Sequence, residues 1–98
     1  MDDYQIVASS RIIEKLLIEH GVDLEEVEEA FHYWVGKPLI DDRAEHRTRP
    51  PTVWFCSATS EGRILKIVGI PHRKTKEFIL KSAYSADDWE IDLYEENQ

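Results

Sequence analysis

Cysteine is almost absent from this chain of 98 residues, and long apolar runs are absent as well. The single cysteine, Cys56, excludes an internal disulfide and a zinc site built from cysteines, and such scarcity is typical of the reducing cytosol. Because Cys56 ends an apolar run that starts at Val53, we expect a buried structural thiol rather than a nucleophile. No apolar run reaches the roughly 20 residues that a membrane helix needs. The N-terminus lacks the positive charge of a signal peptide, so the sequence predicts a cytoplasmic protein.

Glycine and proline are also few, with four of each. The length suits one folded domain over residues 1–98. Aromatic residues make up 10% of the chain, which argues against disorder. The histidines lack the spacing of metal ligands, and nothing else in the sequence predicts a metal or another cofactor. These histidines are His20, His32, His46 and His72.

Positive charge is the minority sign, yet it is concentrated in the middle of the chain. The formal net charge is −8, but residues 43–81 contain nine basic side chains and only three acidic ones. Both ends of the sequence are therefore strongly acidic. A basic face attracts phosphate or a carboxylate-rich partner even on an acidic protein, so we seek a binding site first in residues 43–81.

Apolar spacing and turn residues predict an α+β fold with an antiparallel sheet of about four strands, two N-terminal helices and one C-terminal helix. Gly21 ends the first helix, and Asp23 with Glu26 forms a capping box for the second. Ser85 with Asp88 repeats the capping pattern before the last helix. We expect the helices to cover one sheet face and to leave a basic face open. The predicted elements are a strand at 4–8, helices at about 10–20 and 24–34, a short strand at 39–42, strands at 52–58, 63–70 and 76–83, and the final helix.

Four short motifs carry a family resemblance through their order and spacing. They are His20, Gly21 and Val22 before a glutamate-rich helix; Glu61, Gly62, Arg63, Ile64 and Leu65 at a hairpin; Ile79, Leu80, Lys81, Ser82 and Ala83 on the last strand; and the late Tyr94. Together they resemble the BrnT-type toxins of bacterial toxin and antitoxin pairs, which belong to the RelE and ParE fold. The resemblance implies an endoribonuclease that cleaves RNA without a metal, and an antitoxin protein as its partner.

Two positions depart from the pattern of that family. Ile79 and Tyr84 stand where such toxins carry basic residues, and the toxins are typically basic whereas this chain is acidic. These departures favour an alternative function, which is a binding module of the same fold that binds nucleic acid or a protein without catalysis. A further alternative is that the acidic helical face at Glu25, Glu28 and Glu29 binds a basic protein.

RNA cleavage without a metal needs a base for the ribose hydroxyl, cations for the phosphate and an acid for the leaving oxygen. His46 is the predicted base because an unperturbed histidine exchanges protons near neutral pH. The arginines beside His46 suit phosphate, which they bind through two hydrogen bonds at once. The predicted catalytic residues are His46, Arg47, Arg63, Lys81 and Tyr84.

The predicted RNA-binding residues are the other basic side chains of the middle segment. A basic loop or strand face contacts the phosphate backbone, although solvated surface charge explains the same pattern without a function. For Lys81 the alternative to a catalytic role is a solvent-facing strand position, which the strand pattern favours, and for Tyr84 it is packing. We expect the three tryptophans to pack, with base stacking by an exposed Trp54 as the alternative. The RNA-binding set is Arg43, Arg49, Lys66, Arg73, Lys74 and Lys76.

Overall fold

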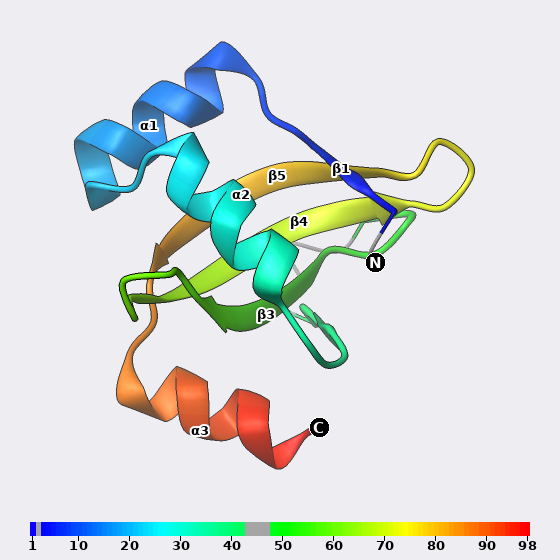
Figure 1. Ribbon diagram of the computed structural model, residues 1–98. Helices are drawn as coiled ribbons and strands as arrows, with labels where there is room; N and C mark the ends of the chain where they lie inside the picture. The colour runs from blue at the N-terminus through cyan, green and yellow to red at the C-terminus, as the bar shows by residue number, and fades with distance from the viewer. Residues whose placement is uncertain (2, 43–47) are drawn as a thin grey trace.

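Five strands form one mixed sheet in the described part of the chain, which is residues 1, 3–42 and 48–98 of the computed structural model (Figure 1). Three of the strands make the antiparallel meander that the sequence predicts, and a short strand extends the sheet at each edge. In spatial order the strands are β1 (Gln5–Val7), β5 (Glu77–Ser85), β4 (Ile64–His72), β3 (Val53–Ala58) and β2 (Leu39–Ile40).

The α+β prediction is confirmed, but the prediction of about four antiparallel strands is wrong because of the first strand. β1 pairs with β5 in parallel, and Gln5 lies opposite Glu77. β1 and β2 occupy opposite edges of the sheet, so the two helices between them carry the chain across one face. The partner of β1 is β5, which comes from the far end of the sequence. Local sequence patterns do not reveal a pairing between such distant segments.

The end signals in the sequence place α1 (Ser10–His20) and α2 (Leu24–Tyr33) correctly. Gly21 has a φ of 61° and ends α1, because glycine adopts the left-handed conformation without a steric cost. The Asp23 side chain accepts a hydrogen bond from the backbone N–H of Glu26 at 2.9 Å, and the Glu26 side chain accepts one from the backbone N–H of Asp23 at 3.3 Å. This capping box satisfies N–H groups that the first turn of α2 leaves unpaired.

The start of α3 (Asp88–Glu96) differs from the prediction. Ser85 is the predicted cap, but it still belongs to β5 and pairs with Leu65. Asp87 is the residue that caps the helix, and Glu90 Oε1 accepts a hydrogen bond from the backbone N–H of Asp87 at 3.0 Å. The pairing of β5 with β4 therefore moves the helix start along the chain. None of the helices in the described residues is long and apolar enough to cross a membrane.

Helices pack on both faces of the sheet, so the expectation of one open face is wrong over the part that α3 covers. Side chains alternate along a strand. Phe55 and Phe78 face α2, where the Phe31 ring centre lies 5.9 Å and 5.3 Å from theirs. Trp54 faces the other side, where its ring centre lies 6.0 Å from that of Tyr94 in α3. Figure 1 shows α3 beyond β3, apart from α1 and α2.

We expect Gly69→Ala to destabilise the fold by about 3 kcal/mol, because added atoms in a packed core force neighbouring groups apart. A Cβ at Gly69 would lie 2.4 Å from the Phe78 ring and 2.6 Å from the carbonyl oxygen of Ile79. Gly62→Ala is the control, since this turn residue has a φ of 86° but open space around it, and we expect a loss of about 1 kcal/mol there. Urea denaturation followed by tryptophan fluorescence measures both losses. Equal losses would contradict the close packing at Gly69.

Candidate functional site

The predicted site residues that the structure describes do not form a single cluster. Arg43, His46 and Arg47 lie outside the described residues. The described candidates are spread along the sheet: Arg63 precedes β4 and Arg73 follows it. The nine residues of β4 separate these two arginines by roughly 30 Å at about 3.3 Å per residue. One phosphate group cannot contact both ends of this strand.

All four prolines of the chain line one groove, which we call the proline groove. It has a volume of about 700 Å³ and lies where β2, the start of β3 and the β4–β5 turn meet. Proline has a fixed φ and no N–H, so these residues give the groove a stiff, apolar wall with few hydrogen-bond donors. The lining residues are Pro38, Ile40, Pro50, Pro51, Val53, Pro71, His72, Arg73, Lys74 and Thr75.

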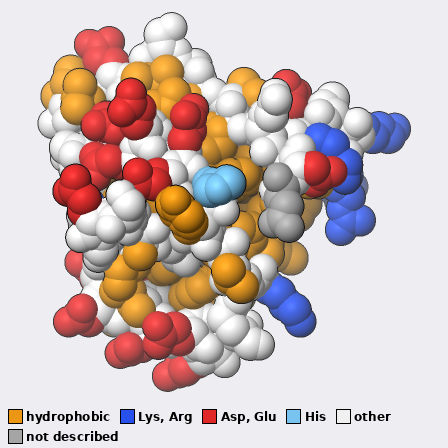
Figure 2. Space-filling model, in the orientation of Figure 1, with side chains coloured by type: hydrophobic (Ala, Val, Ile, Leu, Met, Phe, Trp, Pro, Cys, Tyr) orange, Lys and Arg blue, Asp and Glu red, His pale blue; other side chains and the backbone are white. Residues whose placement is uncertain are grey.

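Arg73 and Lys74 form a cationic rim on the proline groove. Both are exposed in the β4–β5 turn, and neither has an ion-pair partner among the residues that the structure describes. Lys76 in the same turn is different, because its Nζ lies 3.6 Å from the Asp3 carboxylate and 5.2 Å from the centre of the Tyr4 ring. Figure 2 shows Lys and Arg gathered toward this end of the molecule and Asp and Glu gathered over the helices. The segregation of charge in the sequence is thus also a segregation on this face.

The described residues on both sides of residues 43–47 lie at the proline groove. Ile40 precedes that segment and Pro50 follows it, and both line the groove. The backbone N–H of Asp41 donates to the carbonyl oxygen of Thr52 at 2.8 Å, so the two flanks lie side by side. The described flanks of residues 43–47 and the basic β4–β5 turn therefore meet at this groove.

Arg63 holds the end of α1. Its NH1 donates to the carbonyl oxygen of Gly21 at 3.1 Å and to the Glu26 carboxylate at 3.0 Å. Its NH2 donates to the carbonyl oxygen of His20 at 3.3 Å, and its Nε donates to the Ser85 hydroxyl at 2.9 Å. The last turn of a helix leaves carbonyl groups unpaired and carries partial negative charge, so a cation there is stabilising. These contacts give Arg63 a structural role that its position beside a turn did not predict.

Lys66, which was expected on a sheet face, is buried beneath α3. Its Nζ lies 2.8 Å from Oε2 of Glu90 and 4.6 Å from the centre of the Trp54 ring. The Tyr84 hydroxyl donates to the same oxygen of Glu90 at 3.2 Å. The exposed fraction is 10% for the Lys66 side chain and 3% for that of Glu90. Charges this deeply buried need a partner, so this ion pair helps to fix α3 on the sheet.

Hydrogen bonds keep both members of the pair charged. Burial acts to raise the pKa of Glu90, but hydrogen bonds from Lys66 and from the backbone of Asp87 hold that pKa below its ordinary value. Burial acts to lower the pKa of Lys66, but hydrogen bonds with Glu90 and Tyr84 hold it above its ordinary value. The contact is therefore an ion pair across the neutral range.

Lys81 is exposed at a β-bulge in β5. Val68 pairs with Ser82 whereas Gly69 pairs with Leu80, which leaves Lys81 without an opposite residue on β4. A bulge of this kind inserts one residue into a strand and redirects side chains locally. The predicted solvent-facing position of Lys81 is confirmed.

The tryptophans have different surroundings, although the sequence predicts packing for all three. Trp54 is buried, and the Trp34 ring stacks on Phe55 with 4.0 Å between ring centres. The Trp34 Nε1 also donates to the Tyr94 hydroxyl at 2.7 Å. Trp89 is 63% exposed on α3, so the packing prediction is wrong for this residue. Cys56 is buried as expected, and burial raises the pKa of its thiol to about 11.

The acidic helical face was the alternative binding surface. One of its three glutamates makes a hydrogen bond within the protein. Glu25 and Glu28 are exposed on α2. Glu29 instead accepts a hydrogen bond from the backbone N–H of Ser60 in the β3–β4 turn. Hydrogen bonds from the side chain and the backbone of Ser60 hold the pKa of Glu29 below its ordinary value. Glu29 thus connects α2 to the hairpin.

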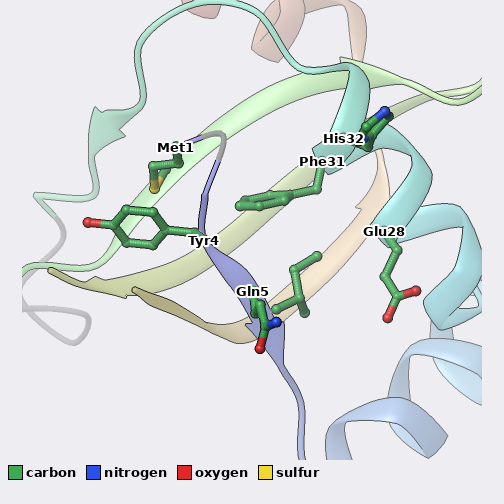
Figure 3. A pocket seen from close by; sticks show the side chains of 7 residues that line it. Met1, Tyr4, Gln5, Glu28, Phe31 and His32 are labelled. Atoms are coloured by element: carbon green, nitrogen blue, oxygen red, sulfur yellow. The ribbon is translucent and has the colours of Figure 1, made fainter. Parts of the chain in front are cut away.

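A second hollow, of about 470 Å³, lies between β1 and α2 (Figure 3). Figure 3 shows Phe31 extending from α2 toward β1, with Met1 and Tyr4 across from it. None of the described residues of the predicted catalytic and RNA-binding sets lines this hollow, and we assign it no part in the site. Its lining residues are Met1, Tyr4, Gln5, Ile6, Glu28, Phe31 and His32.

Sequence reasoning missed Glu90 as the partner of Lys66 and missed the gathering of the prolines. A lysine among aliphatic residues on a strand is a signal that an acidic partner exists. The partner itself lies 24 residues away on another element, and no spacing rule connects the two.

A scan against protein-family models finds no matching family, and comparisons with curated proteins and with solved structures find no match. Function is therefore inferred from the residues and geometry of this chain.

We expect Lys66→Met to destabilise the protein by about 3 to 5 kcal/mol, because it leaves the Glu90 charge buried without its partner. Lys66→Met combined with Glu90→Leu removes both charges and restores most of that loss. Denaturant unfolding of the single and the double variant measures the difference. Equal stability of the two variants would show that the unpaired charge of Glu90 is not the cause of the lost stability.

The pH dependence of the unfolding free energy, measured for the unmodified protein and the double variant, tests the same ion pair. The pKa of Glu90 lies below its ordinary value of 4.5 in the folded state, so its contribution to stability is present above that value and disappears as the pH falls through the folded pKa. The unfolding free energy of the unmodified protein therefore falls more steeply between about pH 5 and about pH 3 than that of the double variant. Parallel profiles would contradict this origin of the acid sensitivity.

Proposed function

We propose that this chain binds single-stranded RNA at the proline groove, as a toxin-like module of the BrnT and RelE type. One observation supports the proposal: the rim cations Arg73 and Lys74 are exposed on an apolar groove and have no ion-pair partner in the described part of the protein. Exposed cations without internal partners bind phosphate oxygens readily, and arginine does so through two bonds at once.

The acidic surroundings favour a short flexible strand over a duplex. Asp and Glu gather over the helices, on the other side of this face from the cationic end (Figure 2). A duplex is stiff, so its phosphates would extend past the groove toward these carboxylates, where repulsion opposes binding. A single strand can place a few phosphates on the rim and a base or ribose on the apolar wall.

The order of elements supports the family part of the proposal. A strand, two helices, a short strand, a three-stranded meander and a closing helix follow one another along the chain. The resemblance to BrnT-type toxins rests on this order of elements together with the four sequence motifs. An antitoxin that neutralises the protein in the cell is then the expected protein partner.

RNA cleavage is the second candidate function, and it depends on His46 and Arg47. Both residues lie outside the part of the chain that the structure describes. Thr48 belongs to the flank that ends at the groove, where its hydroxyl donates to the carbonyl oxygen of Pro50 at 2.6 Å. Arg63 and Tyr84 contribute less to this candidate, because Arg63 binds the end of α1 and Tyr84 binds Glu90.

We expect Arg73→Glu with Lys74→Glu to weaken RNA binding at least about tenfold near about 0.1 M salt, because two phosphate contacts become repulsive. The negative slope of the logarithm of the binding constant against the logarithm of salt concentration becomes shallower by about 1.4, since each phosphate contact with a single strand contributes about 0.7. Fluorescence anisotropy with a labelled single strand of about ten nucleotides measures both quantities.

The control for this experiment is Arg11→Glu with Lys15→Glu, which makes the same change of charge at exposed positions on α1. Screening limits the effect of these distant charges to less than about threefold. Equal loss of affinity in the two double variants would place RNA binding somewhere other than the proline groove.

For cleavage, we expect His46→Ala to lower the rate by about a hundredfold or more, since a general base contributes on that scale. RNA digestion by purified protein and growth arrest after induced expression are the two measurements. His32→Ala, at an exposed position on α2, leaves both unchanged. An unmodified protein that binds RNA but neither cleaves it nor arrests growth would rule out cleavage and leave the binding function intact.

A further inference from the structure

Beneath α3, one carboxylate oxygen is held by two donors within an aromatic frame. Oε2 of Glu90 lies 2.8 Å from Nζ of Lys66 and accepts the hydroxyl of Tyr84 at 3.2 Å. Nζ of Lys66 lies 4.6 Å from the centre of the Trp54 ring and 5.7 Å from that of the Tyr84 ring. A cation and a hydroxyl that converge on one anionic oxygen beside aromatic rings are the groups that bind an RNA phosphate and stack its neighbouring base.

We propose that Trp54, Lys66 and Tyr84 form a second RNA-binding site on the sheet face, and that Glu90 of α3 occupies it in this structure in place of a phosphate. This inference rests on the proposed binding of RNA. It adds a site that becomes available only when α3 leaves the sheet. The unoccupied form of the site is then a minor state of the protein, and RNA shifts the population toward it.

The way in which α3 is attached suits an element that detaches. Of its nine residues only Glu90 and Tyr94 are buried, and Trp89 and Leu93 are 63% and 41% exposed. A segment that buries little apolar surface opens at lower free energy than the core of the protein does.

Besides the apolar contacts of Tyr94 and Ile91 with the core, several attachments of α3 are polar and can be replaced by water. The Trp34 Nε1 donates to the Tyr94 hydroxyl at 2.7 Å. The Gln98 side chain, just beyond the helix, accepts from the backbone N–H of Lys37 at 2.7 Å and donates to the carbonyl oxygen of Lys37 at 3.0 Å. These bonds orient α3, and the ion pair with Lys66 supplies its one buried charge contact among the described residues.

RNA suits the uncovered face better than an acidic peptide does. Trp54 and Tyr84 present rings on the same face as Lys66, because Trp54 lies opposite Val68 and Tyr84 lies opposite Lys66 in the register of the sheet. A nucleotide uses the rings and the cation together, through its base and its phosphate. A carboxylate side chain uses only the cation and the hydroxyl, as Glu90 does.

The proposal is tested by comparing the RNA affinity of Glu90→Gln with that of Glu96→Gln. Each variant removes one negative charge from α3, but Glu96 is exposed whereas Glu90 binds Lys66. Glutamine at position 90 keeps an oxygen for the backbone N–H of Asp87, so the helix start is preserved. We expect Glu90→Gln to bind the labelled RNA strand about tenfold more tightly than the unmodified protein, because the open state becomes more populated, and Glu96→Gln less than about twofold more tightly.

Adding Lys66→Met to Glu90→Gln returns the affinity to that of the unmodified protein or below. Equal affinities of Glu90→Gln and Glu96→Gln would overturn the second site. Binding by the unmodified protein that does not depend on Arg73 and Lys74 would instead overturn the proposed function, so the two failures are distinguishable. Circular dichroism confirms that each variant is folded.

Cys56 provides an independent measurement of the same opening. It is the single thiol of the chain, is 8% exposed, and lies opposite Lys66 on the face that α3 covers. Because burial and the Glu90 charge both raise the pKa of Cys56, the rates are compared per thiolate after the pH dependence of each variant is measured. We expect Glu90→Gln to react with a thiol reagent faster than Glu96→Gln on this basis, and we expect the RNA strand to slow that reaction by covering the face. Equal reaction rates in the two variants, or no protection by RNA, would contradict the proposal.

Discussion

β4 determines the architecture, because its central residues are buried from both sides of the sheet. The six residues from Leu65 to Ile70 are all buried. A strand that is buried on two faces needs a layer of structure on each. α1 and α2 supply one layer and α3 supplies the other. Lys66 is the charged member of this run, so the second layer must bring a carboxylate as well as apolar surface, and α3 brings Glu90 and Tyr94.

The sequence predicts the parts of the fold that depend on neighbouring residues. Gly21 ends α1, Asp23 begins α2, and Gly62 takes its place in the β3–β4 turn with a positive φ. Each of these signals acts over a few residues, so it can be read without knowing the rest of the chain. The start of α3 marks the limit of this reading. Ser85 and Asp87 each have an acidic residue three positions later, and only the strand pairing of Ser85 decides between them.

Contacts between distant segments determine the candidate site, and no local sequence pattern predicts such contacts. Arg63 and Arg73 look alike in the sequence, since each is a basic residue beside a turn. In the structure Arg63 binds the carbonyl groups that end α1, whereas Arg73 stands exposed on the rim of a groove. The sequence predicts that basic residues gather in residues 43–81, but only the tertiary structure separates the cations that hold the fold from those that are available to a ligand.

The parallel pairing of β1 with β5 has a consequence for the order of folding. β3, β4 and β5 are joined by short turns, so the meander forms from contacts that are close in sequence. β1 needs a partner from the other end of the sequence, and closing so long a loop costs entropy before any contact offsets it. During synthesis the first strand and the first two helices leave the ribosome before their partner strand exists. β1 therefore cannot join the sheet until β5 has been synthesised. The time at which the first strand folds depends on the last strand.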